Sequence, residues 1–190
     1  MKVLGIMGSP RIGGNSDILL EQALSGAKDA GAEVEKIILC RKKISGCLNC
    51  EKCNMTGVCV LRDDMPEIHK KILQADTVIH SGPIYFWTLT AQIKAYLDRW
   101  CAFFDANWNW HKKYAPIMKK KKIGVIAVCG DPNLKTADPM IRVFKKTCEF
   151  GNKLIWLGAV RASADVKGEI AKNGKAKKQA YNLGKKGASL

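Results

Sequence analysis

The chain has 190 residues, a length that suits one domain with a full hydrophobic core. Hydrophobic residues make up 47% and charged residues 26%, ordinary values for a globular protein in water, and no apolar run is long enough to span a membrane. Lysine and arginine outnumber aspartate and glutamate by 32 to 17, which gives a net charge of +15. The basic runs carry no interleaved aromatic residues, so the charge disfavours nucleic acid binding. The positive charge indicates mainly solvated faces of the protein. The alternative is that it steers acidic partners or phosphorylated cofactors toward the surface.

The start of the chain predicts a phosphate site. Lys2–Met7 is apolar with little alternation, as a buried parallel strand should be, and an amphipathic helix follows from about Ser16 to Ala30. The loop between them, residues 8–16 (GSPRIGGNS), presents backbone N–H groups beside a helix N-terminus, an arrangement that binds phosphate. Its side-chain donors belong to Ser9, Arg11, Asn15 and Ser16. The loop matches neither a dinucleotide-binding nor a P-loop motif, and the alternative is a plain turn capped by Asn15 or Ser16.

Four of the eight cysteines fall within thirteen residues, after a second predicted strand at Glu33–Cys40. They are separated by two, two and five residues, inside a loop at residues 41–65, and are Cys47, Cys50, Cys53 and Cys59. The apolar start of the chain is too short and too soon broken for a signal peptide. We therefore expect a cytoplasmic protein, in which lasting disulfides are rare.

The cysteine spacing favours an iron–sulfur cluster over zinc. Structural zinc usually takes two short-spaced pairs that a longer segment separates. Three cysteines with two residues in each gap instead wind round one corner of a compact inorganic core, as in the bacterial ferredoxin run, and Gly57 lets the chain turn back for the fourth. We therefore expect a [4Fe–4S] cluster, with zinc and with free or redox-exchanging thiols as the alternatives.

A second ligand-binding loop follows the third predicted strand, Asp76–Ser81. Residues 82–90 (GPIYFWTLT) lead from this strand into a helix predicted over Ala91–Phe104. In an open α/β sheet, ligands lie beyond the carboxyl ends of the strands, so this loop meets the same crevice as residues 8–16. We expect Tyr85 and Phe86 to flank a planar ring, and Trp87 either to do the same or to pack in the core.

Three other features lie along the chain. Aromatic residues gather between Phe103 and Trp110, too many for a small loop to bury, which indicates an oligomer interface or a lid over the cofactor. Cys40 is interpreted as a core residue of the second strand. His69 is expected on the surface of a short helix that Asp63 or Asp64 caps.

The remaining elements complete an α/β alternation. Strands are predicted at Ile123–Cys129 and Lys153–Val160, with Gly130 and Asp131 as a third loop of the crevice. Helices are predicted at residues 137–150 and from about residue 165 to residue 184. Five strands that alternate with helices predict a doubly wound parallel sheet of order 2-1-3-4-5, with its switch point between the first and third strands. Because no repeat or linker interrupts the pattern, we expect a single domain over residues 1–190.

Several of these motifs also occur together in a known family. They are residues 8–11 (GSPR), 14–16 (GNS), 83–86 (PIYF) and 91–99 (AQIKAYLDR). In combination they resemble the NAD(P)H-dependent FMN reductases of flavodoxin-like fold. The four cysteines and residues 63–65 (DDM) look like the iron–sulfur flavoprotein branch of that family. The resemblance covers most of residues 1–131.

The resemblance implies a three-layer, flavodoxin-like α/β sandwich that binds FMN and forms a homodimer or homotetramer. By this resemblance, the FMN phosphate is held by Ser9, Arg11, Asn15 and Ser16. The isoalloxazine lies along Pro83, Ile84, Tyr85, Phe86 and Trp87, with Gly130 and Asp131 at its far edge. In the iron–sulfur branch, the ligands of a [4Fe–4S] cluster are Cys47, Cys50, Cys53 and Cys59.

We expect an FMN-dependent oxidoreductase that passes electrons between NAD(P)H or ferredoxin, FMN, the [4Fe–4S] cluster and an acceptor. The sequence contains no H-E-x-x-H motif and no recognisable Ser/His/Asp set, and we assign no general acid or base. The expected partner is a small-molecule electron donor or acceptor, or an acidic ferredoxin-type protein that the basic surface suits. Three alternatives stay open: a non-enzymatic electron carrier, a cluster-free NAD(P)H:flavin or quinone reductase, and a redox or metal sensor.

Overall fold

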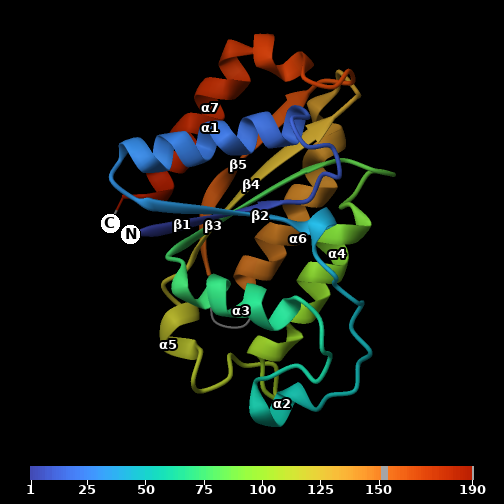
Figure 1. Cartoon of the computed structure of the whole chain (residues 1–190), viewed down its shortest axis with the longest axis vertical. Coiled ribbons are helices and arrows are strands. Elements are labelled where there is room, and N and C mark those ends of the chain that lie inside the picture. Colours follow the sequence, from blue (N-terminus) through green and yellow to red (C-terminus); the bar gives the residue numbers. More distant parts are fainter. Residues whose placement is uncertain (151–153, 190) are drawn as a thin grey trace.

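The computed structural model describes residues 1–150 and 154–189, and its sheet is the predicted one (Figure 1). All five strands run parallel in the order β2-β1-β3-β4-β5. Their bounds are β1 Lys2–Met7, β2 Glu33–Ile38, β3 Thr77–Pro83, β4 Lys122–Cys129 and β5 Ile155–Ser163. Because the strand order reverses between β1 and β3, a crevice opens beyond their carboxyl ends.

Helices cover both faces of this sheet (Figure 1). One face packs against α1 (Asn15–Asp29) and α7 (Gly174–Gly187). The other packs against α3 (Met65–Gln74), α4 (Ala91–Asp98) and α6 (Asp138–Glu149). Each face has its own hydrophobic core, which explains why the strands are apolar with little alternation. No helix within residues 1–150 and 154–189 is long and apolar enough to cross a membrane.

The first and last long helices touch backbone to backbone. A Cβ atom placed on Gly184 of α7 would lie 1.7 Å from the carbonyl oxygen of Ala23 in α1. One placed on Gly26 of α1 would lie 2.1 Å from the carbonyl oxygen of Tyr181 in α7. These two positions therefore need glycine because of close approach between helices, without any unusual backbone angle.

Short helices account for most of the differences from the predicted bounds. They are the 3₁₀ turns η1 Leu39–Arg41, η2 Arg99–Phe103, η3 Leu134–Ala137 and η4 Glu169–Lys172, and the short α-helices α2 Cys53–Thr56 and α5 Ala115–Met118. The helix predicted to run to Phe104 is α-helical only to Asp98 and then tightens into η2. The last helix begins at Gly174, because η4 occupies part of the range predicted for it. Lys153, the predicted start of the fifth strand, lies outside the described residues.

Three predictions about individual side chains are wrong. His69 is buried, because Phe103 of η2 packs against it, with the two ring centroids 4.7 Å apart. Cys40 is exposed, because β2 ends at Ile38 and the chain turns before it. The aromatic stretch is largely buried, since Phe104 stacks on Trp110 at 4.2 Å and both lie in the core.

Candidate functional site

Two adjoining cavities lie at the carboxyl ends of β1, β3 and β4. The first, of about 170 Å³, is lined by Ser9, Arg11, Asn15, Ser16, Pro83, Ile84, Tyr85, Val128, Gly130, Ala164, Asp165 and Lys167. The second, of about 370 Å³, is lined by Ile84, Tyr85, Phe86, Trp87, Cys129, Gly130, Asp131 and Thr136. The two share Ile84, Tyr85 and Gly130, so they form one continuous crevice. All eleven residues predicted from sequence to contact a flavin line one or both cavities.

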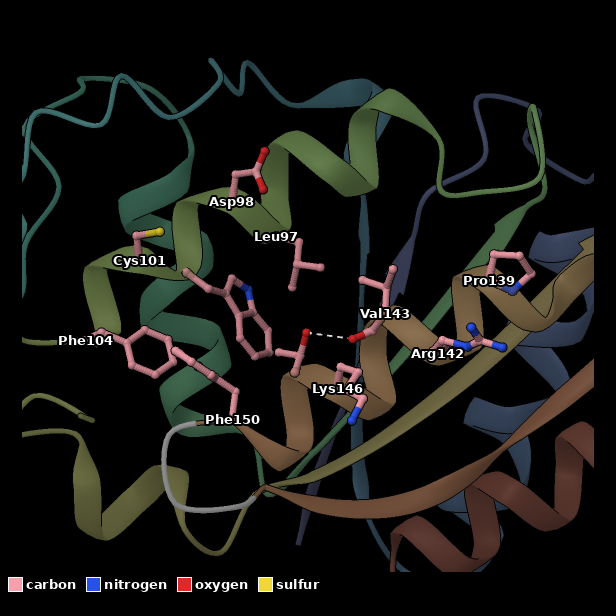
Figure 2. Close-up of a pocket in the computed structure, with 11 residues that line it drawn as sticks. Leu97, Asp98, Cys101, Phe104, Pro139, Arg142, Val143, Lys146 and Phe150 are labelled. Carbon is pink, nitrogen blue, oxygen red and sulfur yellow. Dashed lines mark hydrogen bonds between the residues drawn. The ribbon is translucent and has the colours of Figure 1, made fainter. Parts of the chain in front are cut away.

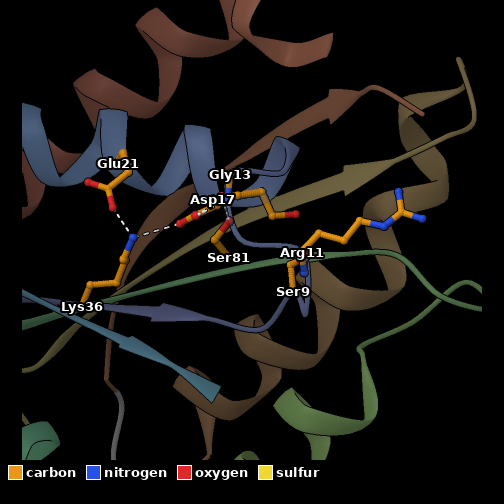
Figure 3. A network of polar contacts seen from close by, with 8 residues as sticks. Ser9, Arg11, Gly13, Asp17, Glu21, Lys36 and Ser81 are labelled. Carbon is orange, nitrogen blue, oxygen red and sulfur yellow. Dashed lines mark hydrogen bonds and ion pairs between the residues drawn. The ribbon is translucent and has the colours of Figure 1, made fainter. Parts of the chain in front are cut away.

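The loop after β1 is shaped by hydrogen bonds within itself and to α1 (Figure 3). The hydroxyl of Ser9 accepts a hydrogen bond from the N–H of Arg11 at 3.1 Å. The carboxylate of Asp17 accepts one from the N–H of Gly13 at 2.8 Å and pairs with Lys36 at 3.0 Å. The same lysine pairs with Glu21. Figure 3 shows the Arg11 side chain extending away from this network, which leaves its guanidinium available to an anion.

The side-chain cap of α1 by Asn15 or Ser16, which was the alternative to a phosphate site, is absent. The helix begins at Asn15, and its N-cap is Gly14, which caps it without a side chain. The amide of Asn15 instead donates to the carbonyl oxygens of Val166 at 2.9 Å and Ala164 at 3.3 Å, and its oxygen accepts from the N–H of Ile170 at 3.2 Å. Asn15 thus joins the start of α1 to the loop after β5, and we expect its backbone N–H rather than its amide to face an anion.

The aromatic loop ends in a tight two-residue turn. Tyr85 and Thr88 exchange backbone hydrogen bonds of 3.2 and 3.1 Å, which leaves Phe86 and Trp87 at the tip. Both tip residues have a left-handed backbone, with φ of 47° and 61°, and their exposed fractions are 90% and 68%. Bulky residues rarely adopt this conformation, and such strain gathers at binding sites. The turn therefore presents two aromatic rings beside an open crevice instead of burying them.

The loop after β4 forms the far wall of the crevice. The carboxylate of Asp131 accepts hydrogen bonds from the hydroxyl of Thr136 at 2.7 Å and from the N–H of Asn133 at 2.8 Å. These bonds, that of Thr136 first, lower the pKa of Asp131 below its usual value. Asp131 is therefore an anion whose carboxylate is held by hydrogen bonds within its own loop. Its side chain does not occupy the N–H groups around Gly130.

A third cavity, of about 130 Å³, brings the cysteines together. It is lined by Cys47, Cys50, Cys53 and Cys59, together with a fifth cysteine, Cys101 of η2. Burial, followed by the nearby thiols of Cys59, Cys47 and Cys50, raises the pKa of Cys53. Burial and the thiols of Cys47 and Cys53 raise the pKa of Cys101 to about 11. Folding thus brings five thiols to the lining of one cavity.

The neck of the cysteine loop is tied by two aspartates. Asp64 accepts a hydrogen bond from the N–H of Lys43 at 2.7 Å, and Asp63 accepts one from the N–H of Ser45 at 3.0 Å. Arg99 of η2 then pairs with Asp63 through its guanidinium, with distances of 2.6 and 3.2 Å. The predicted side-chain cap of α3 is absent, because the N-cap residue Asp64 makes no cap hydrogen bond, although the N–H of Met65 donates to Asp63 at 3.0 Å. Both arms of the loop are therefore anchored to the body of the protein.

The four cysteines line one cavity without forming a tight set of metal ligands. Within residues 1–150 and 154–189, no three His, Cys, Asp or Glu side chains converge tightly enough to hold one ion. A tetrahedral zinc with Zn–S bonds of about 2.3 Å needs its sulfurs about 3.8 Å apart. A cluster spaces its ligands more widely, because each thiolate binds a different iron. The structure thus brings the four thiols to one cavity, and among the described residues it forms no single-ion site there.

A larger apolar groove of about 520 Å³ separates α4 and η2 from α6 (Figure 2). It is lined by Leu97, Asp98, Trp100, Cys101, Phe104, Pro139, Arg142, Val143, Lys146, Thr147 and Phe150. Of its polar groups, the hydroxyl of Thr147 is taken by a 3.0 Å hydrogen bond to the carbonyl of Val143. Cys101 lines both this groove and the cysteine cavity, so only that side chain is common to the two.

Sequence reasoning missed several residues of these sites. Lys167 and Asp165 line the first cavity from the loop after β5, a segment that the sequence predicted to be the start of a helix. Lys36 of β2 pairs with Asp17 of α1, which also accepts from Gly13 in the loop after β1, and no local pattern indicates this contact. Two of the missed residues could have been found in the sequence. Arg99 and Cys101 are a charged residue and a thiol that interrupt an aromatic stretch at residues 99–104.

Comparison with known proteins gives consistent results. Residues 1–137 match the family model described as NADPH-dependent FMN reductase. An iron–sulfur flavoprotein of Archaeoglobus fulgidus is 38% identical over 148 residues, which cover 76% of this chain and 63% of that relative. One of Methanocaldococcus jannaschii is 42% identical over 99 residues, 52% of this chain and 51% of the relative. The chain thus spans about half to two thirds of the length of these curated relatives. The solved structure of the Trp repressor binding protein of Bacillus subtilis superposes with a TM-score of 0.73 at 27% identity, covering 95% of this chain and 99% of the other.

Proposed function

The chain belongs to the NADPH-dependent FMN reductase family, and from this premise we propose that it is an FMN-dependent oxidoreductase of the iron–sulfur flavoprotein branch. The observation that carries the proposal is the continuous crevice, because all eleven residues expected to hold FMN line it although they come from three separate loops. Bound FMN supplies the redox chemistry, since it accepts a hydride from a nicotinamide and releases electrons one or two at a time.

The protein's part in this chemistry is to bind and orient. Arg11 and Lys167 supply positive charge at the first cavity, and the N–H groups at the start of α1 supply donors for a phosphate. The strained turn at Phe86 and Trp87 offers aromatic surface to the ring. The backbone N–H donors around Gly130 suit the polar edge of the isoalloxazine ring. No proton-transferring side chain is needed for hydride acceptance, which agrees with the absence of an assigned general acid or base.

We propose that the cysteine cavity holds a [4Fe–4S] cluster through Cys47, Cys50, Cys53 and Cys59. The names of the curated relatives and the donor set support this proposal. A bound cluster supplies one-electron transfer. We further propose a single domain, a cytoplasmic location, a homodimer or homotetramer, and an acidic ferredoxin-type protein or a small molecule as electron partner, for which the net charge of +15 is suited.

The test is an anaerobic purification followed by a visible spectrum and by analysis of FMN, iron, sulfide and zinc on the same sample. We expect one FMN per chain and about four iron and four sulfide per chain. FMN without iron would leave a cluster-free flavin reductase, and zinc in place of iron would favour a sensor. A sample that contains no flavin and takes up no added FMN would overturn the central proposal.

A matched pair of cysteine variants tests the ligands. Cys47→Ser should lose iron and sulfide and keep FMN, because the two sites share no lining residue. Cys40→Ser is the control, since this exposed thiol lies outside the cysteine cavity. Loss of iron in both variants, or in neither, would argue against the assigned ligand set.

Steady-state assays separate the enzyme from an electron carrier. The proposed reductase oxidises NADPH or NADH in the presence of a flavin, quinone or dye acceptor. A flavoprotein that shows no such turnover with either nicotinamide, but is reduced by ferredoxin, would instead be a non-enzymatic carrier.

A further inference from the structure

The two cavities of the crevice meet at a short junction. The first cavity is lined by the loop after β1 and by the cations Arg11 and Lys167, and the second is lined by the exposed aromatic turn. Gly130 lies at the junction, since it is one of the residues that line both cavities. A ligand with a phosphate in the first cavity and a ring in the second therefore runs its linker past Gly130.

The side chain of Asp165 lies against Gly130 at this junction. A Cβ atom placed on Gly130 would lie 3.2 Å from Oδ1 of Asp165 and 3.6 Å from its Cγ. Asp165 also lines the first cavity, and among the described residues that do so it is the only acid. A side chain at position 130 would crowd the carboxylate, so glycine there leaves Asp165 beside the path of the linker.

The backbone around Asp165 is held by the fold. The N–H groups of Asp165 and Val166 donate to Oε2 of Glu169, at 2.9 and 3.1 Å. The amide of Asn15 donates to the carbonyl oxygens of Ala164 and Val166, the residues on either side of Asp165. These bonds join the loop after β5 to itself and to the start of α1. The position of Asp165 is therefore set before any ligand binds.

The carboxylate of Asp165 is free, although its backbone is not. In the part of the chain that the structure describes, it accepts no hydrogen bond and forms no ion pair. Asp131, the other acid of the crevice, is instead bound to Thr136 and to the N–H of Asn133 in its own loop. An ionised carboxylate only accepts hydrogen bonds, and it repels a phosphate. Its suitable partner is a neutral hydrogen-bond donor such as a hydroxyl group.

We propose that Asp165 is a specificity-determining residue that accepts hydrogen bonds from hydroxyl groups on the linker between the ring and the phosphate of the cofactor. The inference rests on the proposed function and deepens it, because the linker of FMN is a ribityl chain, which carries hydroxyl groups. Arg11 and Lys167 offset the negative charge that the carboxylate brings to the first cavity. The crevice thereby selects a flavin by its linker as well as by its ring and its phosphate.

The rival role is structural, in which Asp165 only packs against Gly130 and shapes the loop after β4. The two roles differ in what they predict for two ligands that share a ring and a phosphate but differ in the linker. Loss of a structural contact weakens the binding of both ligands equally. Loss of a hydroxyl acceptor weakens only the ligand that carries hydroxyl groups.

The experiment measures the Kd of two ligands by flavin fluorescence. One is FMN, and the other is an analogue in which a plain pentyl phosphate chain replaces the ribityl phosphate. The full wild-type chain, freed of flavin, is compared with Asp165→Ala, Asp165→Asn and the control Glu149→Ala. Glu149 is an exposed acid that lies outside both crevice cavities. Circular dichroism checks that each protein is folded.

We expect the wild type to bind FMN more tightly than the analogue. Asp165→Ala should raise the Kd of FMN roughly tenfold or more, the size expected for hydrogen bonds to a charged group. The Kd of the analogue should stay the same or fall, because a charge that repels its phosphate is removed. Asp165→Asn should lie between, since its amide oxygen still accepts a hydrogen bond without the charge. Glu149→Ala should match the wild type for both ligands.

The outcomes are distinct. A wild-type protein that binds neither ligand overturns both the proposed function and this role of Asp165. A wild type that binds FMN without preferring it to the analogue, or whose preference is unchanged in Asp165→Ala, overturns the role of Asp165 alone and leaves the proposed function standing. If Asp165→Ala fails to fold, the decision passes to Asp165→Asn, and an unchanged preference there overturns the inference.

Discussion

At the scale of single residues, charged groups divide into those that the fold has already paired and those that remain free for a ligand. Asp17, Asp63 and Asp131 each accept hydrogen bonds from nearby backbone N–H groups. Arg11 is exposed and forms no ion pair within the described parts of the chain. Because it lines the first cavity, Arg11 is a cation that FMN phosphate can engage without breaking an existing contact.

Arg11→Gln should therefore weaken FMN binding without affecting the fold. A hydrogen bond to a charged group contributes about 1.5–3 kcal/mol, which corresponds to a rise in Kd of roughly 10-fold to 150-fold. Titration of the flavin-free protein with FMN, followed by flavin fluorescence, measures this change. Arg41→Gln is the control, since this exposed arginine lies outside both crevice cavities. Equal affinities of the two variants would remove Arg11 from the phosphate site.

At the scale of elements, the site depends on how closely the helices approach one another. The loop after β1 runs directly into α1, whose position on the sheet is set by α7. Asn15 at the start of α1 also holds the loop after β5, which carries Lys167 into the crevice. A displacement of α1 therefore moves two walls of the first cavity together.

Gly184→Ala tests this dependence. The added Cβ would meet the carbonyl oxygen of Ala23 at 1.7 Å, so α7 must shift away from α1. We expect a loss of about 1–3 kcal/mol in the free energy of unfolding, as is typical of overpacking, and weaker FMN binding as the crevice deforms. Gly174→Ala, at a position with open space around it, should cost little or stabilise α7. Urea denaturation of the flavin-free proteins provides the comparison, and equal stability of the two would refute the close contact.

At the scale of the whole molecule, the core between the sheet and α3, α4 and α6 encloses two histidines that are neutral in the folded state. Burial lowers the pKa of His80 to about 3, and burial followed by the charge of Arg99 lowers the pKa of His69 to about 4. In the unfolded chain both return to the ordinary value of 6.5. Between these values the unfolded state binds more protons than the folded state, so the stability rises with pH.

The free energy of unfolding should accordingly fall as the pH is lowered from about 6.5 to about 5. The slope approaches two protons, or about 2.7 kcal/mol per pH unit, at the acidic end of this window. Urea denaturation across the window measures it. His69→Gln should remove roughly one proton from the slope, because glutamine does not titrate. A stability that stays constant across the window would show that the two histidines are not buried as neutral groups.

Much of the fold and of the candidate site can be predicted from local patterns in the sequence. Apolar strands separated by amphipathic helices predict the strand order, because right-handed crossovers and loops at the carboxyl ends leave few topologies. The same rule predicts that residues 8–16, 82–90 and 130–131 meet, and they do line one crevice. The spacing of the four cysteines predicts that they share a site, and they line one cavity.

Other features were decided by contacts between residues distant in the sequence. The burial of His69 depends on η2, which lies over α3 only in the folded chain. The fifth thiol, Cys101, reaches the cysteine cavity from η2, more than forty residues after Cys59. The side chain of Asn15, predicted as a helix cap or phosphate ligand, bonds residues 164, 166 and 170 instead.

The sequence by itself determined the sheet, the order of its strands and the three loops of the crevice, because periodicity and turn residues act over a few neighbouring positions. Only the tertiary structure decided which charges are buried, which are paired and which face a cavity. Arg99 illustrates the difference, since its position after α4 was visible in the sequence, but its contacts with Asp63 and Ser45 cross 36 and 54 residues of chain. Such contacts follow from packing between elements, and no local pattern encodes them.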